Sequence, residues 1–114
     1  MVYDYNGEIE TLLSGLKVPV SFMFYEGDAD TYVVYSQMSK ENSLAGEDKV
    51  IGCVIYYDFD IYSKSNYLAL QKEIIDTMVA GGWTYEPSRE SPDLYERDTR
   101  FFHKTIVLAK ESEG

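Results

Sequence analysis

Two short clusters of carboxylates have the spacing that comes nearest to a metal-binding or catalytic site. The segment EGDAD places Glu26, Asp28 and Asp30 two positions apart, and Asp58 and Asp60 form a second Asp-x-Asp pair. Calcium prefers oxygen ligands of this kind, but the calcium loop of an EF-hand has twelve residues and ends in a glutamate. Counted from Asp28, the twelfth position is Ser39. Two interpretations remain: the pairs converge on a divalent ion, as in a metal-dependent hydrolase, or EGDAD is a solvated turn. We favour the turn and expect no metal requirement.

The other reactive side chains do not assemble into a catalytic set. His103 is the only histidine, and in a strand beside Phe102 and Lys104 it is more typical of a packed or surface residue than of a base. Cys53 lies on the core face of a predicted strand, the setting of an inert thiol. One cysteine and one histidine cannot build a Cys/His zinc site. No nucleophile with its base and no phosphate-binding glycine motif is recognisable, so we expect no catalytic residue, no cofactor and no enzymatic activity.

Composition indicates a single globular domain that avoids nucleic acid. The chain has 114 residues, 45% of them hydrophobic, which suits one packed core over residues 1–114. Its net charge of −10 would repel phosphate backbones, so sequence-specific binding to DNA is not expected. This charge favours solubility, a basic partner, or a passage through which DNA slides without sticking.

Membrane insertion and secretion are not expected either. No apolar run approaches the roughly 20 residues that span a bilayer. The N-terminal segment MVYDYNGEIE lacks a basic region followed by an apolar core, so it predicts no secretory signal. The lone cysteine cannot form an internal disulfide, which favours folding in a reducing, intracellular compartment.

Hydrophobic periodicity predicts two helices. In NGEIETLLSGLK, four apolar residues recur at the spacing of one helical face, with Asp4 or Asn6 as the cap: Ile9, Leu12, Leu13 and Leu16. A second helix is expected over residues 65–80, capped by Ser63 or Ser65 and ended by two glycines.

Strands are predicted over residues 20–25, 31–37, 50–62, 83–87 and 100–110. The six-residue tip EGDADT is expected to join the first two as a hairpin. In the run 50–62 the odd positions are all apolar or aromatic and form the core face, whereas the even positions are apolar at one end and acidic at the other. The polar segments 38–49 and 88–99 are expected to be irregular loops. The predicted fold is therefore α+β, a mainly antiparallel sheet of four to five strands with two helices packed on one face.

Interaction residues are sought on the polar segment and on the even face of the long strand. We predict that segment 38–49 is mobile in the isolated subunit and orders on assembly, because it has few apolar anchors. Eleven tyrosines are more than so small a core needs, and tyrosine is favoured at interfaces. The predicted interaction residues are Met38, Lys40, Glu41, Asp48, Lys49, Tyr56 and Asp58.

Three blocks of the sequence carry a resemblance to a known family. A short helix and an apolar strand precede YEGDADTY, the long strand runs into DIYSKSNY, and DLYERDTRFFHK follows near the end. In this order the blocks resemble the small tail-terminator, or tail-completion, proteins of long-tailed bacteriophages and prophages. They span most of the chain, and each is moderately specific.

The resemblance implies a structural role. Such proteins form a ring, typically of six subunits, on the end of the finished tail tube, where they stop tube growth and present a surface to the head-side connector. The implied partners are other copies of the chain, the tail-tube protein and the connector, with DNA passing through without specific binding. The implied locations are the host cytoplasm during assembly and the head-proximal end of the virion tail.

A small acidic inhibitor or immunity-type protein is the alternative interpretation. Its negative charge would cover a basic site on a nuclease or toxin and would accelerate association. The ring hypothesis predicts self-association and binding to tube ends, whereas the inhibitor hypothesis predicts a tight one-to-one complex with a basic protein.

Overall fold

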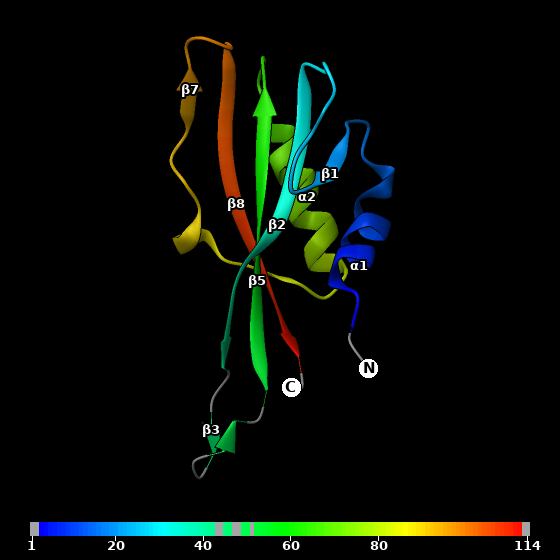
Figure 1. Cartoon of the computed structure of the whole chain (residues 1–114), viewed down its shortest axis with the longest axis vertical. Coiled ribbons are helices and arrows are strands. Elements are labelled where there is room, and N and C mark those ends of the chain that lie inside the picture. Colours follow the sequence, from blue (N-terminus) through cyan, green and yellow to red (C-terminus); the bar gives the residue numbers. More distant parts are fainter. Residues whose placement is uncertain (1–2, 43–44, 47–48, 51, 113–114) are drawn as a thin grey trace.

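The structure is a computed structural model that describes residues 3–42, 45–46, 49–50 and 52–112 (Figure 1). Its helices are α1 (Tyr5–Leu12) and α2 (Leu68–Ala80), with single 3-10 turns η1 (Leu13–Gly15) and η2 (Pro87–Arg89). The strands are β1 (Val20–Phe22), β2 (Thr31–Asn42), β3 (Ala45–Gly46), β4 (Lys49–Val50), β5 (Cys53–Ser63), β6 (Thr84–Tyr85), β7 (Leu94–Glu96) and β8 (Phe101–Ser112). None of the described helices is long and apolar enough to cross a membrane.

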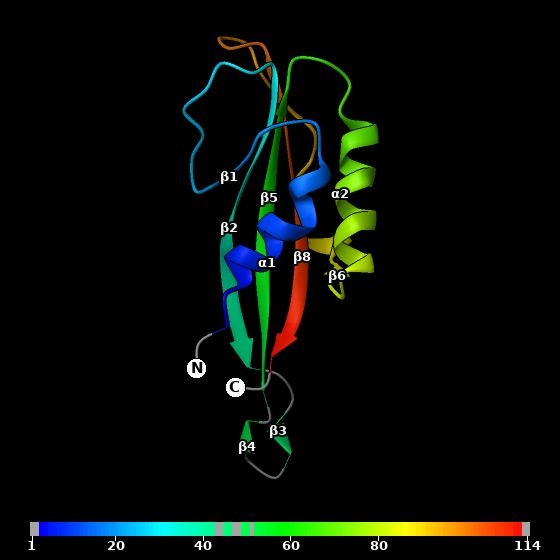
Figure 2. The same ribbon diagram turned by 90° about the vertical axis from the view of Figure 1, so that its right-hand side faces the viewer.

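Three long strands form the centre of a mixed sheet. Strands β2, β5 and β8 pair antiparallel, β1 lies along the outer edge of β2, and the short strands β6 and β7 share the outer edge of β8. Helices α1 and α2 cover one face of the sheet (Figure 2). The predicted α+β class and the mainly antiparallel sheet are confirmed, and the sheet has six strands rather than four to five.

The predicted hairpin between segments 20–25 and 31–37 is wrong. Strand β1 pairs with β2 in parallel, with Val20 opposite Val33, and it ends at Phe22. A tight turn at Met23 directs the chain away from the sheet, and residues 23–30 then carry it back to the start of β2. The short connection suggested a hairpin, but this early turn makes the segment a crossover between parallel strands.

The predicted irregular loop over 38–49 is also wrong. Strand β2 continues to Asn42, which pairs with Cys53 of β5. Three positions further along, Ala45 of β3 pairs with Val50 of β4. The two pairs have the same register, so β3 and β4 extend the β2–β5 hairpin. The far end of the β2–β5 hairpin, continued by β3 and β4, forms an arm that projects beyond the helices (Figure 1). The whole molecule, arm included, measures 52 × 26 × 23 Å. Residues 43–44 and 47–48 lie outside the described residues. The polar composition of this segment favoured a loop, but its backbone groups are hydrogen-bonded between the paired strands.

The core lies between the helices and one face of β5. Every odd-numbered side chain of β5 from Cys53 to Ser63 is buried, and the even-numbered ones are half-buried, so the predicted core face is confirmed. From the helices, Ile9, Ile74 and Met78 pack onto this face. Two core tyrosines fix α1 through their hydroxyls. The Tyr57 hydroxyl donates to the Asn6 side chain at 2.7 Å, and the Tyr35 hydroxyl donates to the Asn6 carbonyl at 3.4 Å. Burial raises the pKa of Tyr57.

Helix boundaries follow the local caps. Asp4 caps α1 as predicted, because its carboxylate accepts the Gly7 N–H at 3.0 Å. The second helix begins at Leu68, not at Ser65, and the predicted serine caps are wrong. Ser63 is buried and hydrogen-bonds Thr31 Oγ1 instead, while the Asn66 side chain accepts the Leu68 N–H at 2.9 Å.

A polar cluster fastens the N-terminal helix to the last strand. Glu8 accepts hydrogen bonds from Trp83 Nε1 at 2.6 Å and from Lys110 Nζ at 2.5 Å. Burial alone would raise the pKa of Glu8, but the hydrogen bonds from Lys110, Tyr3 and Trp83 outweigh it and leave this pKa below its ordinary value. The cluster therefore joins α1 to Trp83, in the segment after α2, and to β8.

The predicted loop over 88–99 also contains ordered elements, namely part of η2 and the strand β7. Lys104, buried on the helix side of β8, donates to the Ser91 carbonyl at 2.6 Å and lies 3.5 Å from a Glu90 carboxylate oxygen. The Tyr67 hydroxyl donates to Asp93. These contacts hold residues 90–93 against the edge of the sheet and so position β7.

Because the two faces of β5 differ in burial, we expect two adjacent substitutions to have opposite effects on folding. Ile55→Asp places a charge at a position that is 5% exposed, and the penalty is comparable with the net stability of roughly 5–15 kcal/mol of a small domain. Val54→Asp places the same charge on the helix-free face. In urea unfolding followed by circular dichroism, we expect no cooperative transition for Ile55→Asp and a folded Val54→Asp. A more damaging Val54→Asp would show that the faces are swapped.

Candidate functional site

The predicted interaction residues on β2 are divided between the two faces of the sheet. Met38 is the extra residue of a β-bulge in β2 and is 48% exposed. Lys40 pairs with Ile55 and so shares the helix side, whereas Glu41 pairs with Val54 on the helix-free side. Lys49 belongs to β4, and Asp48 lies outside the described residues. The bulge changes which residues of β2 share a face, so these residues do not form one patch.

Three side chains meet on the helix-free face of the sheet. The Arg89 guanidinium lies 4.0 Å from the centre of the Tyr56 ring, and its Nη2 lies 3.3 Å from Glu41 Oε2. Arg89 therefore links η2, at one edge of the sheet, to β2 two strands away. Predicted residues Tyr56 and Glu41 are brought together here, but they are engaged by a residue of the same subunit.

The acidic pair of β5 is also engaged within the subunit. Asp58 accepts a hydrogen bond from Ser36 Oγ at 2.8 Å, and Asp60 accepts one from Thr105 Oγ1 at 2.5 Å. His103 Nε2 lies 3.3 Å from the same Asp60 oxygen. Burial raises the pKa of Asp58, and the neighbouring charge of Asp60 adds to this effect. Thr105 Oγ1 also lies 3.5 Å from His103 Nε2, so Asp60, His103 and Thr105 form one hydrogen-bonded group across β5 and β8.

A row of four stacked rings crosses the same face. Tyr25 stacks on Tyr32 at 4.3 Å between ring centres, Tyr32 on Tyr62 at 4.9 Å, and Tyr62 on His103 at 4.3 Å. The row joins the segment before β2 to strands β2, β5 and β8. Burial raises the pKa of Tyr62 to about 12. Because the ring faces cover one another, the row acts as a clamp across the strands and offers little open surface for a planar ligand.

The segment EGDAD is held in place by this row. The hydroxyl of Tyr25 accepts the Ala29 N–H at 3.1 Å, and a Cβ at Gly27 would lie 2.0 Å from the same hydroxyl oxygen. Glycine is therefore required at that position while the Tyr25 ring stays stacked. Among the described residues, no group of three or more His, Cys, Asp or Glu side chains is placed to hold a metal ion.

The β1 edge of the sheet exposes an apolar surface that the sequence analysis did not identify. We define the β1-edge patch as Phe22, Met23 and Phe24, whose exposed fractions are 43%, 60% and 65%. Phe22 packs on Tyr35 at 5.6 Å between ring centres, which fixes one end of the patch to the core. Exposed neighbouring side chains of this size are unusual on a monomeric protein and indicate a contact surface.

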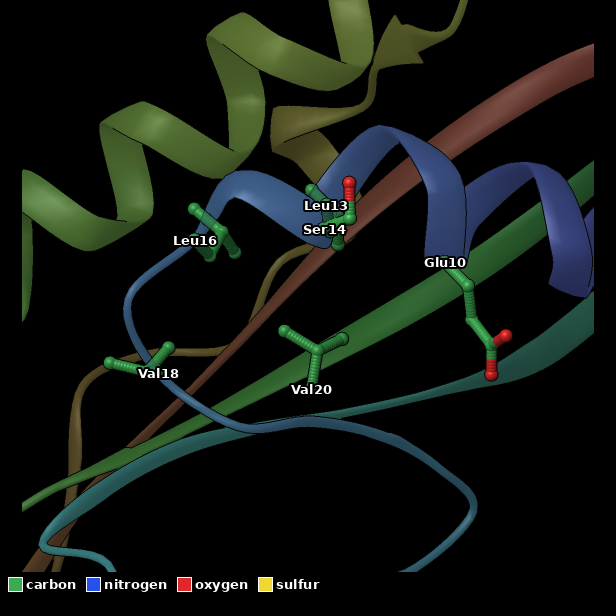
Figure 3. Close-up of a pocket in the computed structure, with 6 residues that line it drawn as sticks. All are labelled: Glu10, Leu13, Ser14, Leu16, Val18 and Val20. Carbon is green, nitrogen blue, oxygen red and sulfur yellow. The ribbon is translucent and has the colours of Figure 1, made fainter.

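A hollow of about 280 Å³ lies between the first helix and the chain that leads into β1 (Figure 3). The end of α1 and η1 forms one wall, and residues 18–20 form the other. Its lining is mostly apolar, with a carboxylate at one side: Glu10, Leu13, Ser14, Leu16, Val18 and Val20. The hollow extends the apolar surface along the β1 side of the sheet.

The opposite edge of the sheet carries a second, different surface. We define the β7-edge patch as the exposed apolar residues Leu94, Tyr95 and Phe102 together with Lys64 and Arg100 beside them. Tyr95 and Phe102 have ring centres 4.9 Å apart, and with Lys64 and Arg100 they line a pocket of about 350 Å³. The pocket therefore has an aromatic floor and two cations at its rim, in a chain whose net charge is −10.

Both patches contain a residue with an unfavourable backbone conformation. Within the described residues, Met23 (φ 72°) and Arg100 (φ 64°) are the two non-glycine residues with positive φ. The Phe24 N–H donates to the Phe22 carbonyl at 2.8 Å and closes a γ-turn on Met23, a rare and strained form of that turn. Arg100 ends the turn between β7 and β8, at a conformation that glycine adopts most easily. Strain of this kind concentrates at functional sites.

Two signals in the sequence could have identified these edges. Phe22, Met23 and Phe24 are consecutive, and a strand can bury only alternate side chains, so at least one of them had to face outward. Tyr95 precedes a turn that contains two arginines, a local excess of positive charge in an acidic chain. The patches themselves were not predictable, because they depend on which strands form the edges of the sheet.

No model of a known protein family matches the chain, and no curated protein matches it. The functional interpretation therefore depends on the two patches, the arm and the residues quoted for the resemblance.

Neutralising Asp58 is expected to stabilise the domain. Because the pKa of Asp58 is raised in the folded state, its ionised carboxylate lowers the free energy of unfolding at neutral pH. This penalty decreases as pH falls through the raised pKa and is lost below the ordinary value of 3.8. Asp58→Asn keeps an oxygen acceptor for Ser36. Its melting temperature should exceed that of the unmodified protein at pH 7, with the difference vanishing below pH 3.8. Asp28→Asn, in an exposed loop, is the control. A lower melting temperature for Asp58→Asn at pH 7 would contradict this account.

Glycine at position 100 is expected to relieve backbone strain. A side chain in the left-handed region costs about 1–2 kcal/mol, and the greater freedom of glycine in the unfolded chain returns about 0.5–1 kcal/mol. Arg100→Gly should therefore raise the free energy of unfolding, by roughly 0.5–1 kcal/mol. Arg97→Gly, in the same turn but without positive φ, should lower it. Urea unfolding of both variants provides the measurement, and a destabilised Arg100→Gly would show that Arg100 stabilises the isolated subunit.

Proposed function

We propose that this protein is a tail terminator of a long-tailed phage or prophage, a structural subunit that assembles into a ring on the end of the tail tube. In this role it ends tube growth and presents a surface to the head-side connector. No catalytic residue, metal or cofactor is part of the proposal. The segments YEGDADTY, DIYSKSNY and DLYERDTRFFHK, whose resemblance suggests this family, contribute residues to both patches or lie beside them.

The observation that carries the proposal is the pair of unlike patches on opposite edges of one sheet. A two-fold dimer needs one self-complementary patch, whereas a head-to-tail ring needs two different patches on each subunit. The β1-edge patch is apolar and is followed by the acidic segment 26–30, and the β7-edge patch combines aromatic side chains with arginine and lysine. This difference favours a heterologous contact over a symmetric one.

The projecting β2–β5 arm supplies a third surface. In a ring, equivalent arms from all subunits project in the same direction, which suits contact with the next ring of a tube or with the connector. The exposed residues Met38, Lys40 and Glu41 lie on this arm, so the predicted interaction residues fit a contact between rings better than a contact within one. Polar contacts at such a rim set register more than affinity.

The acidic charge is consistent with a subunit that surrounds the path of DNA. A net charge of −10 on each subunit would repel phosphates and let the genome pass without binding. The same charge would also suit an inhibitor of a basic protein. The unlike patches distinguish the two proposals, since a one-to-one inhibitor has no need of two apolar edges.

The test is co-expression with the tail-tube protein encoded in the same genome. We expect the protein to bind one end of the tubes and to stop their growth, measured as tube length and end labelling by electron microscopy. Tyr95→Asp should abolish capping, because it places a charge within an apolar contact. Val79→Asp is the matched control, since Val79 is similarly exposed, at 46% against 51% for Tyr95, but lies on α2 and belongs to neither patch.

Two results would contradict the proposal. Tubes whose length does not change when the protein is present would remove the terminator role. A monomer that forms a tight one-to-one complex with a basic protein from the same genome, without binding tubes, would favour the inhibitor.

A further inference from the structure

We propose that subunits join head to tail through one specific contact: Phe24 and the acidic segment 26–30 of one copy occupy the pocket formed by Lys64, Tyr95, Arg100 and Phe102 of the next. This inference rests on the proposed ring and names the surfaces that close it. The occupant is a second copy of this chain, and its chemistry is an exposed aromatic ring followed by carboxylates.

The donor side presents an aromatic side chain and negative charge together. Phe24 is the most exposed large apolar side chain of the described residues, at 65%. Glu26, Asp28 and Asp30 follow it within six residues. The segment is not a loose chain, because the Tyr25 ring stacks on Tyr32 and the Tyr25 hydroxyl accepts the Ala29 N–H. This anchoring reduces the conformational entropy lost when the segment binds.

The acceptor side is complementary in shape and charge. Tyr95 and Phe102 form an apolar floor in a pocket of about 350 Å³, a volume suited to one aromatic side chain and its neighbours. Arg97 and Arg100 have no ion pair with any carboxylate of the described residues. Lys64 lies 3.7 Å from Asp30 of its own subunit, so its charge is partly offset and the arginines supply most of the attraction.

The two sides are placed so that the contact closes a ring. Phe24 follows the edge strand β1 and Tyr95 lies on the edge strand β7, whereas Asp30 and Lys64 of one subunit contact each other between these edges. All four lie at the end of the molecule away from β3 and β4 (Figures 1 and 2). A contact between two sites at the same end joins subunits side by side, with little displacement along the long axis of the molecule. Little rise is the condition for a closed ring rather than an open helix.

The strained residues support the same assignment. The γ-turn on Met23 directs Phe24 away from β1, and the left-handed conformation of Arg100 places a cation where glycine would fit with less strain. Neither conformation is needed to bury the core of a single subunit. Each is explained if the side chain it presents contributes to a contact between subunits.

The test is cross-linking through cysteines at the margin of the contact, which leaves Phe24, Asp28 and Arg100 in place. Glu26→Cys and Arg97→Cys introduce exposed thiols on the two sides, and the native Cys53 is buried. In a concentrated solution of the full chain that carries both substitutions, a short bismaleimide should give a ladder of covalent oligomers that ends in a closed ring. The control combines Glu26→Cys with Lys72→Cys on α2 and should give no ladder.

Charge reversal then tests the pairing itself. Arg100→Glu in the cross-linking background should lower the ladder yield about tenfold, and adding Asp28→Lys should restore it, since opposite charges again face each other. Phe24→Ser should also abolish the ladder while the melting temperature stays near that of the parent, because Phe24 lies outside the core. Absence of a ladder, cross-links only between identical positions, or no rescue by Asp28→Lys would each overturn the proposal.

Failure of this inference can be separated from failure of the proposed function. If tubes are capped but the Glu26–Arg97 ladder is absent, the protein is a terminator with a different subunit contact. If the ladder forms but tube length is unaffected, this contact is correct and the terminator role is not. Capping and cross-linking are measured on the same variants, so the two conclusions remain independent.

Discussion

Burial of one face of β5 beneath the two helices is the interaction on which the rest of the structure depends. The alternating side chains of this strand place Ile55, Phe59 and Ile61 in the core and leave the intervening residues on the helix-free face. Strands β2 and β8 align on either side of it because their own apolar residues must share that face. A one-residue slip would expose the core, so this burial also fixes the register of both neighbours.

The same arrangement explains why the two edges of the sheet differ. The edge strands β1 and β7 have three residues each and cover only parts of β2 and β8, so the aromatic side chains beside them remain exposed. Open edges invite association with other chains, and proteins usually protect them with charge, turns or short strands. Here the edges are short and charged but still present Phe24 and Phe102. The proposed subunit contact would bury both of these side chains.

The helix-free face is stabilised by contacts within the subunit. Arg89 spans β5 to reach Glu41, and the stacked row from Tyr25 to His103 crosses three strands. The acidic residues of β5 take part in this network through Ser36 and Thr105. The tyrosines that exceeded the needs of the helix-side core therefore act mainly as a clamp on the opposite face, and the exposed contact surfaces lie at the edges.

The sequence by itself determined the α+β class, both helices and the core face of β5, and it narrowed the cap of α1 to Asp4 or Asn6, because periodicity and capping depend on neighbouring residues. It did not determine the parallel pairing of β1, the extension of β2 into the arm, or the start of α2 at Leu68. Each of these depends on a partner distant in the chain. Val33 pairs with Val20 of β1, Cys53 pairs with Asn42 of β2, and Thr31 hydrogen-bonds the Ser63 hydroxyl that could have capped α2. The predicted interaction residues were dispersed for the same reason, since the bulge at Met38 reassigns faces along β2. Only the tertiary structure decided which strands became edges, and therefore that Phe24 follows one edge strand, β1, and Arg100 follows the other, β7.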